Sequence, residues 1–405
     1  MTVEDATNDG LTGNVPDLRL SQLVFEVLNE QFSEEKRESA RIELMDTIMA
    51  NNMSGFWYYL HTTYPNLNVE WDEKKYEEML SKAADVLADL ETKIAEAEEA
   101  DGEVEVARGW TKVGEFWARN GNKTRALETL RNAYEKTSGV GNQVDILLTI
   151  IRVGMLFDDK NLIRTELENA ELLVDRGGDW DRRNRLKTYK GLYCISVRNF
   201  EEGAKLLIDS RSTFTSTEVC TYEHVVALTV LAGALTLERV ELKTKVIDSP
   251  EVLQLIPTTP ALEPLTSLTN SLYLCDYATF FKSLAQVEET FLTLHRDLVP
   301  HSAYYVREMR RKAYAQLLES YRALSLRSMA DAFGVTVEFL DADLSKFIPN
   351  RQLNCVIDRV NGVVLTNRPD TKNAQYQALL KQGDILLTKL QKYGAAVRLS
   401  PAERV

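Results

Sequence analysis

Three segments between residues 110 and 204 repeat one pattern of small and large apolar residues, and this repetition restricts the fold more than any other feature. Small residues allow two antiparallel helices to approach each other closely, and large residues fill the remaining space between them. A single helix pair cannot bury its apolar face alone, so such pairs stack in series. The first copy consists of Trp110, Val113, Gly114, Trp117, Gly121, Ala126, Leu130 and Ala133.

The other two copies are more degenerate. The second contains Ile150, Val153, Gly154 and Phe157, and the third contains Gly191, Cys194 and the run Asn199–Ala204. All three follow tetratricopeptide spacings, but their glycines are 40 and 37 residues apart, whereas a standard repeat has about 34 residues. The sequence therefore predicts a mainly α protein that contains a right-handed α-solenoid of tetratricopeptide-like helix pairs.

A long acidic helix is predicted before the repeats, over Trp71–Glu99. Residues 70–103 contain 13 acidic and 4 basic side chains, which is much of the net charge of −13. The apolar residues repeat every 3.5 positions, so they form one stripe. Two interpretations remain open, an antiparallel neighbour in the same chain or a coiled coil with another protein. The stripe consists of Tyr76, Leu80, Ala83, Leu87, Leu90, Ile94 and Ala97.

A winged helix is predicted from Tyr304 onward. Val306, Met309, Ala313, Leu317, Tyr321 and Leu324 recur with the period of a helix. A short helix then ends at Gly334, and Thr336 begins another that runs to Phe347. Two β-branched runs follow, Leu353–Val360 and Val363–Asn367. Asn361 and Gly362 between them predict a hairpin with a type I′ turn.

Charge argues against nucleic-acid binding by this winged helix. The second helix carries Glu338, Asp341, Asp343 and Lys346, a net charge of −2, and these carboxylates would repel phosphates in a DNA groove. The longest apolar run, Val225–Leu237, is too short to span a bilayer, which takes about 20 residues. We therefore expect neither a nucleic-acid partner nor a membrane.

No motif for catalysis is present. The sequence has no Walker A loop, no nucleophile elbow and no H-x-H or H-E-x-x-H. The four cysteines are widely spaced, which suits a reducing compartment, and no secretory signal precedes them. We expect a protein that is not an enzyme, with no catalytic, cofactor-binding or metal-ligating residues and no cofactor.

A final helix is expected over residues 369–394, with Gly394 directly after its last turn. Its leucines form one broad apolar face that lies beyond the winged helix, so a partner is a candidate to cover it. The expected divisions are a disordered N-terminus (1–16), N-terminal helices and the solenoid (17–248), further helices (249–303), the winged helix (304–368), the last helix (369–394) and a tail (395–405).

Several long motifs carry a resemblance to a known family. They include Gly177–Arg185, Lys245–Glu251, Arg307–Lys312, Phe347–Gly362 and Leu390–Leu399. These motifs, together with the order of a solenoid followed by a winged helix, resemble those of PCI-domain proteins. That family is named for proteasome lid, signalosome and initiation-factor subunits. Within that group the chain is similar to lid subunits of the 26S proteasome regulatory particle, of the non-ATPase regulatory subunit 6 type, from about residue 20 onward.

The resemblance implies a non-catalytic scaffold subunit that supports ubiquitin-dependent protein degradation in the cytoplasm and nucleus. The implied partners are other PCI-domain lid subunits and the lid deubiquitinase module, in a hetero-oligomeric complex. In the family, winged helices pack side by side and C-terminal helices form one bundle. The implied interface residues are Val356, Val360, Val363 and Leu365 of the winged helix, and Leu379, Leu380, Leu386, Leu387 and Leu390 of the last helix.

Two alternatives remain. One is a PCI subunit of the signalosome, a scaffold in a complex that removes a ubiquitin-like modifier from cullin ligases. The other is a winged-helix protein that binds nucleic acid, against the charge argument above. Neither the neighbour of each face nor a role for the acidic segment 70–103 follows from the sequence.

Overall fold

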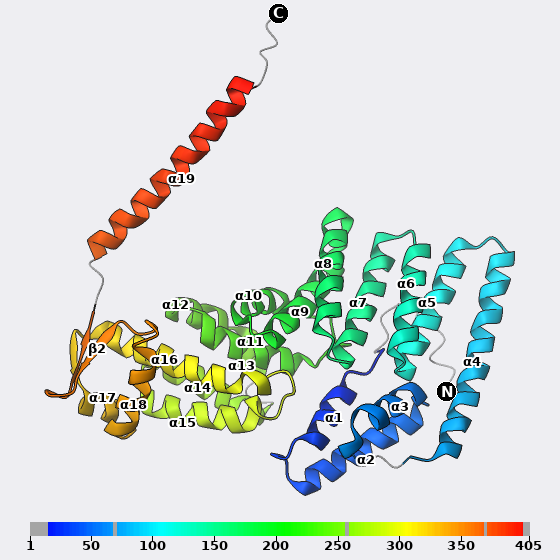
Figure 1. Cartoon of the computed structure of the whole chain (residues 1–405), viewed down its shortest axis with the longest axis horizontal. Helices are drawn as coiled ribbons and strands as arrows, with labels where there is room; N and C mark the ends of the chain where they lie inside the picture. The colour runs from blue at the N-terminus through cyan, green and yellow to red at the C-terminus, as the bar shows by residue number, and fades with distance from the viewer. Residues whose placement is uncertain (1–14, 68–70, 256–258, 368–370, 400–405) are drawn as a thin grey trace, which may run out of the picture. The chain divides into compact units, whose positions relative to one another are not determined.

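The computed structural model describes residues 15–67, 71–255, 259–367 and 371–399, and most of them are helical. The chain forms two compact units, and each is described by itself (Figure 1). The first unit comprises the residues up to Leu274 together with Lys282–Met309. The second comprises Cys275–Phe281 together with the residues from Arg310 onward. This division does not coincide with the expected boundary between residues 303 and 304.

The first unit begins with helices around a small core of their own. Leu20, Leu44, Ile48, Trp57 and Leu60 are fully buried in it. Ser33 caps the second helix by accepting the Lys36 N–H. The helices are α1 (Arg19–Leu28), α2 (Glu34–Ala50), α3 (Ser54–Thr63), the 3₁₀ turn η2 (Pro65–Leu67) and α4 (Glu73–Glu99).

The expected disordered N-terminus needs a correction at its end. Residues 1–14 lie outside the described residues, but Val15 and Pro16 are buried. Val15 packs with Ala118, Ala126 and Val153 in a small cluster. One β-branched side chain at this position is thus enough to join the segment to the solenoid, although the residues before it are polar.

Helix α4 packs against α5 (Glu103–Asn120), the next helix in the same chain (Figure 1). Ala83 and Ile94 of the predicted stripe are buried, and Ile94 lies against Gly109 of α5. Leu80 is exposed. The structure therefore supports the interpretation of a neighbour within the chain, which covers part of the stripe.

The three predicted repeats form three consecutive helix pairs that lie side by side (Figure 1). A Cβ added to Gly114 would lie 2.5 Å from the Leu130 side chain, and one added to Gly191 would lie 2.7 Å from Leu207. Glycine therefore allows each pair to close, as predicted. The pairs are α5 with α6 (Lys123–Lys136), α7 (Val140–Leu156) with α8 (Lys160–Gly177), and α9 (Trp180–Ser196) with α10 (Phe200–Arg211).

The second repeat has a different register from the one its glycine predicts. Asn122, Asp159 and Asn199 cap the second helix of each pair. Gly114 and Gly191 each precede their cap by eight residues, whereas Gly154 precedes Asp159 by five. Gly154 therefore packs near the turn, against Ile163 rather than deep in the pair. The caps are the more regular marker of the repeat, because each begins a helix.

Polar contacts also join successive pairs. Lys123 begins α6, and its Nζ pairs at 2.7 Å with Asp159, the cap of α8. Lys160 begins α8, and its Nζ donates at 3.3 Å to the Ser196 carbonyl at the end of α9. In two successive pairs, the lysine that begins the second helix thus contacts the next helix pair of the solenoid.

A buried network of charges links α7, α9 and the segment after α10. Arg185 donates to Glu218 at 2.7 Å, and its Nη1 lies 3.5 Å from Asp145. Tyr189 donates its hydroxyl to the same Glu218 oxygen at 3.0 Å. Arg152 is almost fully buried and lies 3.4 Å from the Tyr189 hydroxyl. Apart from the Arg152 Nε, which has no hydrogen-bond partner among the described residues, the polar groups of this network are buried with partners, as the interior of a protein requires.

Shorter helices follow along the chain, and two of them, residues 277–287 and 302–320, span the boundary between the two units. Cys275 has a φ of 63° and lies between two of these helices. Pro300 lies in a 3₁₀ turn directly before the next helix. The elements are α11 (Tyr222–Thr236), α12 (Arg239–Leu242), the π-helix η3 (Lys243–Ile247), α13 (Pro250–Leu255), η4 (Pro260–Leu262), α14 (Glu263–Leu274), α15 (Tyr277–Val287), the π-helix η5 (Glu288–Leu292), η6 (Val299–His301) and α16 (Ser302–Ser320).

The second unit contains the predicted winged helix. Gly334 has a φ of 65° and ends α17, and Thr336 caps α18 through the Phe339 N–H. The prediction was wrong at Tyr321 and Leu324, which lie beyond α16, because Ala323–Ser325 forms a strand that pairs with the hairpin. The elements after α16 are β1 (Ala323–Ser325), α17 (Leu326–Phe333), α18 (Val337–Phe347), β2 (Cys355–Asp358), β3 (Val363–Thr366) and α19 (Thr371–Leu399).

Candidate subunit-interface surfaces

The winged-helix sheet presents an apolar pair on its outer face. The strand order is β1-β3-β2, and both pairings are antiparallel. Val356 lies directly opposite Leu365, and these two side chains are 49% and 43% exposed. The neighbouring residue Val364 is completely buried. Side chains alternate between the two faces of a strand, so the outer face carries Val356 and Leu365 while the inner face enters the core.

The other two predicted wing residues differ from this pair. Val363 shares the face of Leu365 but is only partly exposed. Val360 is 95% exposed, in the loop that joins β2 to β3. The structure thus brings three of the four predicted residues onto one face and leaves Val360 at the tip of the hairpin.

The hairpin turn is not the predicted type I′ turn. A type I′ turn requires positive φ at both central residues, and only Gly362 has one, at 65°. Asp358 pairs with Val363, which leaves four residues in the loop. The Asp358 carboxylate accepts the Val360 and Asn361 N–H groups at 3.0 and 3.1 Å. A hydrogen bond from the Asn361 side chain, and then these two N–H groups, lower the Asp358 pKa. The carboxylate thus shapes a wider loop that projects Val360.

Helix α18 is less acidic at its surface than its sequence predicts. Asp343 is buried and accepts a hydrogen bond from the Tyr314 hydroxyl at 3.2 Å, while Arg310 lies 3.3 Å away. Asp341 pairs with Arg359 of the wing at 2.8 Å. Two of the three carboxylates are therefore paired with arginines within the fold, whereas the charge count along the sequence treated them as free.

The exposed part of α18 is partly apolar, which the sequence analysis missed. Val337 and Phe339 are both exposed, and the Arg310 guanidinium lies 5.8 Å from the centre of the Phe339 ring. The helical period of the sequence could have indicated this surface. Leu340, Leu344 and Phe347 form the buried face of the helix, and Val337 and Phe339 lie beside that face.

Helix α19 carries the most extensive apolar surface of the described residues. All five predicted interface leucines are on it and are 57–68% exposed: Leu379, Leu380, Leu386, Leu387 and Leu390. Burial of one leucine side chain is worth about 1.5–3 kcal/mol. A helix that exposes five of them is incomplete without a partner.

The end of α19 needs a correction. Gly394 was expected to follow the helix, but the helix continues through it to Leu399, and residues 400–405 lie outside the described residues. Val397 therefore also lies on the helix, and it is strongly exposed. This extension was not predicted, because glycine favours a helix end without requiring one.

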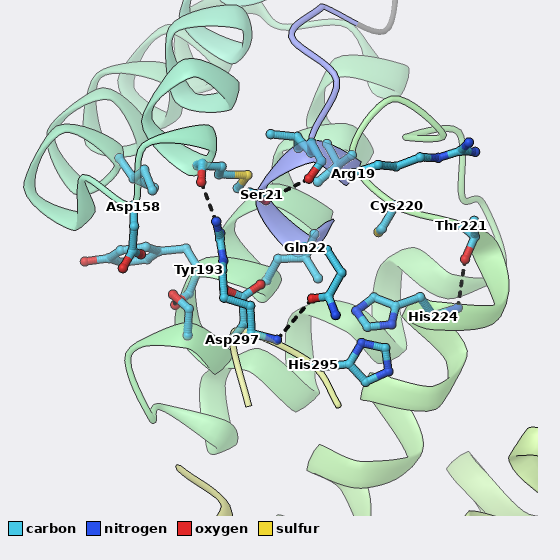
Figure 2. Close-up of a pocket in the computed structure, with 17 residues that line it drawn as sticks. Arg19, Ser21, Gln22, Asp158, Tyr193, Cys220, Thr221, His224, His295 and Asp297 are labelled. Carbon is cyan, nitrogen blue, oxygen red and sulfur yellow. Dashed lines mark hydrogen bonds and ion pairs between the residues drawn. The ribbon is translucent and has the colours of Figure 1, made fainter. Parts of the chain in front are cut away.

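One pocket in the first unit joins distant segments (Figure 2). It has a volume of about 310 Å³. The Gln22 side chain of α1 donates to the Leu294 carbonyl at 2.7 Å. It also accepts the Arg296 N–H at 3.1 Å (Figure 2). The Arg296 guanidinium donates to the Met155 carbonyl at 3.1 Å. Its polar groups thus hold α1 and the loop after η5 in place.

The two histidines of this pocket are held in the neutral form. The rings of His224 and His295 lie 4.7 Å apart between centres. Burial, followed by the neighbouring His224, lowers the pKa of His295 to about 4, and burial also lowers the pKa of His224. Both rings are uncharged at neutral pH and pack as aromatic groups beside Phe291.

Two cysteines that could act as catalytic nucleophiles are also held in their uncharged form by burial. Burial raises the pKa of Cys194 to about 11 and that of Cys220 to about 12, so both thiols stay protonated and weakly nucleophilic. Within the described ranges, no group of three or more His, Cys, Asp and Glu residues could hold a metal ion. No helix there is both long enough and apolar enough to cross a membrane.

Family models match most of the chain. Residues 72–245 match the 26S proteasome subunit RPN7 family, and residues 283–368 match the PCI domain. Residues 375–397 match a model for the C-terminal helix of the 26S proteasome regulatory subunit RPN7/PSMD6. The last match falls entirely within α19, which is the helix with the exposed leucines.

Curated relatives agree with these models. The chain is 47% identical to the 26S proteasome regulatory subunit RPN7 of Saccharomyces cerevisiae, over 98% of this chain and 97% of the relative. It is 38% identical to the 26S proteasome non-ATPase regulatory subunit 6 homolog of Arabidopsis thaliana, over 95% and 97%. Similarity to COP9 signalosome complex subunit 1 of the same plant is lower, at 26% over 49% and 45%.

Proposed function

Because the chain belongs to the 26S proteasome subunit RPN7 family, we propose that it is a non-catalytic scaffold subunit of the lid of the proteasome regulatory particle. In this role it assembles with other PCI-domain subunits and the deubiquitinase module, and supports ubiquitin-dependent degradation. We also propose that it works in the cytoplasm and the nucleus.

The observation that carries the proposal is the apolar face of α19. Its five exposed leucines require a partner in the folded protein, and the family model of the C-terminal helix matches this same segment. The outer face of the winged helix, with Val356 and Leu365, offers a second contact of a different kind. Edge strands and exposed apolar pairs favour protein partners.

Truncation before Asp370 tests the role of α19. In cells whose own subunit is replaced by a tagged copy, the full-length chain should co-purify with proteasome lid subunits. The truncated chain should fold, as judged by circular dichroism and thermal unfolding, but recover at least tenfold less of them. Normal assembly of the truncated chain would show that α19 is not required.

The subunits recovered with the full-length chain test the proposed complex. Signalosome subunits in place of proteasome subunits would favour the alternative scaffold role, for which the similarity to signalosome subunit 1 is the observation. Recovery of neither set would contradict both scaffold roles.

The wing contact is tested separately by Val360→Asp. Val360 is nearly fully exposed in a loop, so the charge should leave the fold intact and weaken one neighbour contact. Val363→Asp is less informative, because Val363 is partly buried and a carboxylate there also strains the sheet. Unchanged incorporation of Val360→Asp, measured against wild type in the same cells, would remove this residue from the interface.

A further inference from the structure

Gly383 lies at the centre of the apolar stripe of α19, where no packing among the described residues explains a glycine. On a helix, the neighbours of a residue are three and four positions away. For Gly383 these are Leu379, Leu380, Leu386 and Leu387, and all four are exposed. The glycine therefore leaves a depression between these four leucine side chains, which we call the socket.

The described residues leave this socket empty. A Cβ added to Gly383 would meet no atom within 4 Å, in contrast to Gly114, where it would meet Leu130 at 2.5 Å. Glycine is among the poorest helix formers, so an exposed helix gains nothing from it. No described residue therefore needs the space above Gly383, whereas Leu130 needs the space above Gly114.

The stripe has the period of helix-to-helix packing. Tyr376, Gly383, Leu390 and Val397 are spaced by seven residues, with Leu379, Leu386 and Tyr393 between them. A seven-residue repeat keeps one seam of a helix against a partner helix, whose side chains insert into sockets of four residues. Gly394 lies on the same seam, about 16 Å farther along the axis.

The charge of α19 indicates whether its partner is another subunit or a second copy of this chain. Residues 371–399 contain five basic side chains and one acidic side chain, in a protein of net charge −13. Lys389 borders the stripe, because Leu386 and Tyr393 are three and four residues from it. Two copies of α19 would repel each other, whereas a helix with acidic residues beside its apolar seam would be attracted.

We propose that Gly383 is the socket into which a helix of another subunit, acidic beside its own apolar seam, inserts a large apolar side chain. Gly394 provides a second place of close approach to the same helix. This inference rests on the proposed assembly role of α19, and it names Gly383 as the position on that helix that selects the partner.

Competition in cells tests the socket. Wild-type and variant full-length chains carry different tags, and their ratio in the purified complex is measured. Gly383→Ala should lower incorporation about threefold and Gly383→Leu at least tenfold, because the added carbons occupy the socket. Thr388→Ala is the matched control, since it also favours the helix but has no stripe residue three or four positions away.

Hydrogen exchange of the uncomplexed full-length chain separates a packing effect from a folding effect. Both Gly383→Ala and Thr388→Ala should slow amide exchange in α19, because alanine is the better helix former. The socket therefore predicts a variant whose helix is more stable and whose incorporation is weaker. Equal or better incorporation of Gly383→Ala and Gly383→Leu would overturn it.

The truncation before Asp370, measured in the same cells, separates this proposal from the proposed function. If the truncated chain is excluded while the Gly383 variants incorporate normally, α19 is an assembly helix without this socket. If the truncated chain also incorporates, the assembly role itself fails.

Charge variants test the occupant. Lys389→Glu should lower incorporation about fivefold, and Lys381→Glu, whose neighbours are off the stripe, should change it less than twofold. Equal effects would contradict an acidic partner beside Lys389. Light scattering should find the purified chain monomeric at micromolar concentration, and a dimer lost on truncation would replace the other subunit with a second copy.

Discussion

At the scale of residues, charge counted along the sequence differs from charge shown at the surface. The sequence analysis treated Asp341 and Asp343 as free carboxylates, but Arg359 and Arg310 neutralise them within the fold. The same holds in the solenoid, where Arg185 and Glu218 are buried together. Side chains far apart in sequence make these pairs, so local reasoning could not find them.

Glu218→Gln should destabilise the first unit by about 2–4 kcal/mol. The carboxylate accepts from both Arg185 and Tyr189, and its loss leaves a buried guanidinium that is only partly compensated by Asp145 at 3.5 Å. Urea unfolding measures the change. Glu201→Gln is the control, because its pair with Lys205 is exposed, and a similar loss there would contradict the role of burial.

Lowering the pH from 7 to 5 should cost about 2 kcal/mol through His295. Its pKa is about 4 in the folded protein and 6.5 when unfolded, so the folded state binds fewer protons between these values. This stability is fully present above pH 6.5 and is lost as the pH falls toward 4. His295→Phe should remove this part of the pH dependence in urea unfolding, and an unchanged profile would contradict the assignment.

At the scale of elements, the sequence predicted most helices, because their periods and caps are local. Gly334 ends a helix and Thr336 begins one, as expected. It failed where a distant partner decides the structure. Strand β1 forms because the hairpin pairs with it, and Gly154 was placed from its spacing although Asp159 sets the register. The wing residues and the α19 leucines remain predicted interface residues, and their arrangement on strands and helix came only with the structure.

Gly114→Val should destabilise the protein by about 2 kcal/mol or more. The new side chain would overlap Leu130, which is fully buried and has no space to move into. Gly177→Val is the control, since a Cβ there meets no atom within 4 Å. Thermal unfolding of both variants measures the difference, and equal effects would show that backbone propensity rather than packing dominates.

At the scale of the whole molecule, the first unit is not a simple linear stack. In a solenoid each repeat contacts its neighbours in sequence, and stability is roughly a sum along the array. Here Gln22 of α1 binds the backbone of Leu294 and Arg296. The first described helix is thereby attached to a segment far along the chain, and loss of either affects both.

Gln22→Ala should lower the stability of the first unit by about 1–3 kcal/mol. The change leaves the Leu294 carbonyl and the Arg296 N–H without their partner in a partly buried site. Amide exchange should accelerate both in α1 and at residues 294–296. Gln31→Ala, at an exposed position, should change neither, and acceleration confined to α1 would contradict the coupling.

The attachment of α1 also has a consequence for synthesis on the ribosome. The partner backbone at Leu294 is made 272 residues after Gln22. At about 5–20 residues per second, helix α1 waits roughly 14–54 s for it. During that interval α2 and α3 can shelter Leu20 and Val24, but the amide of Gln22 remains hydrated. The speed of translation therefore sets how long Gln22 of the nascent chain lacks its partner at Leu294.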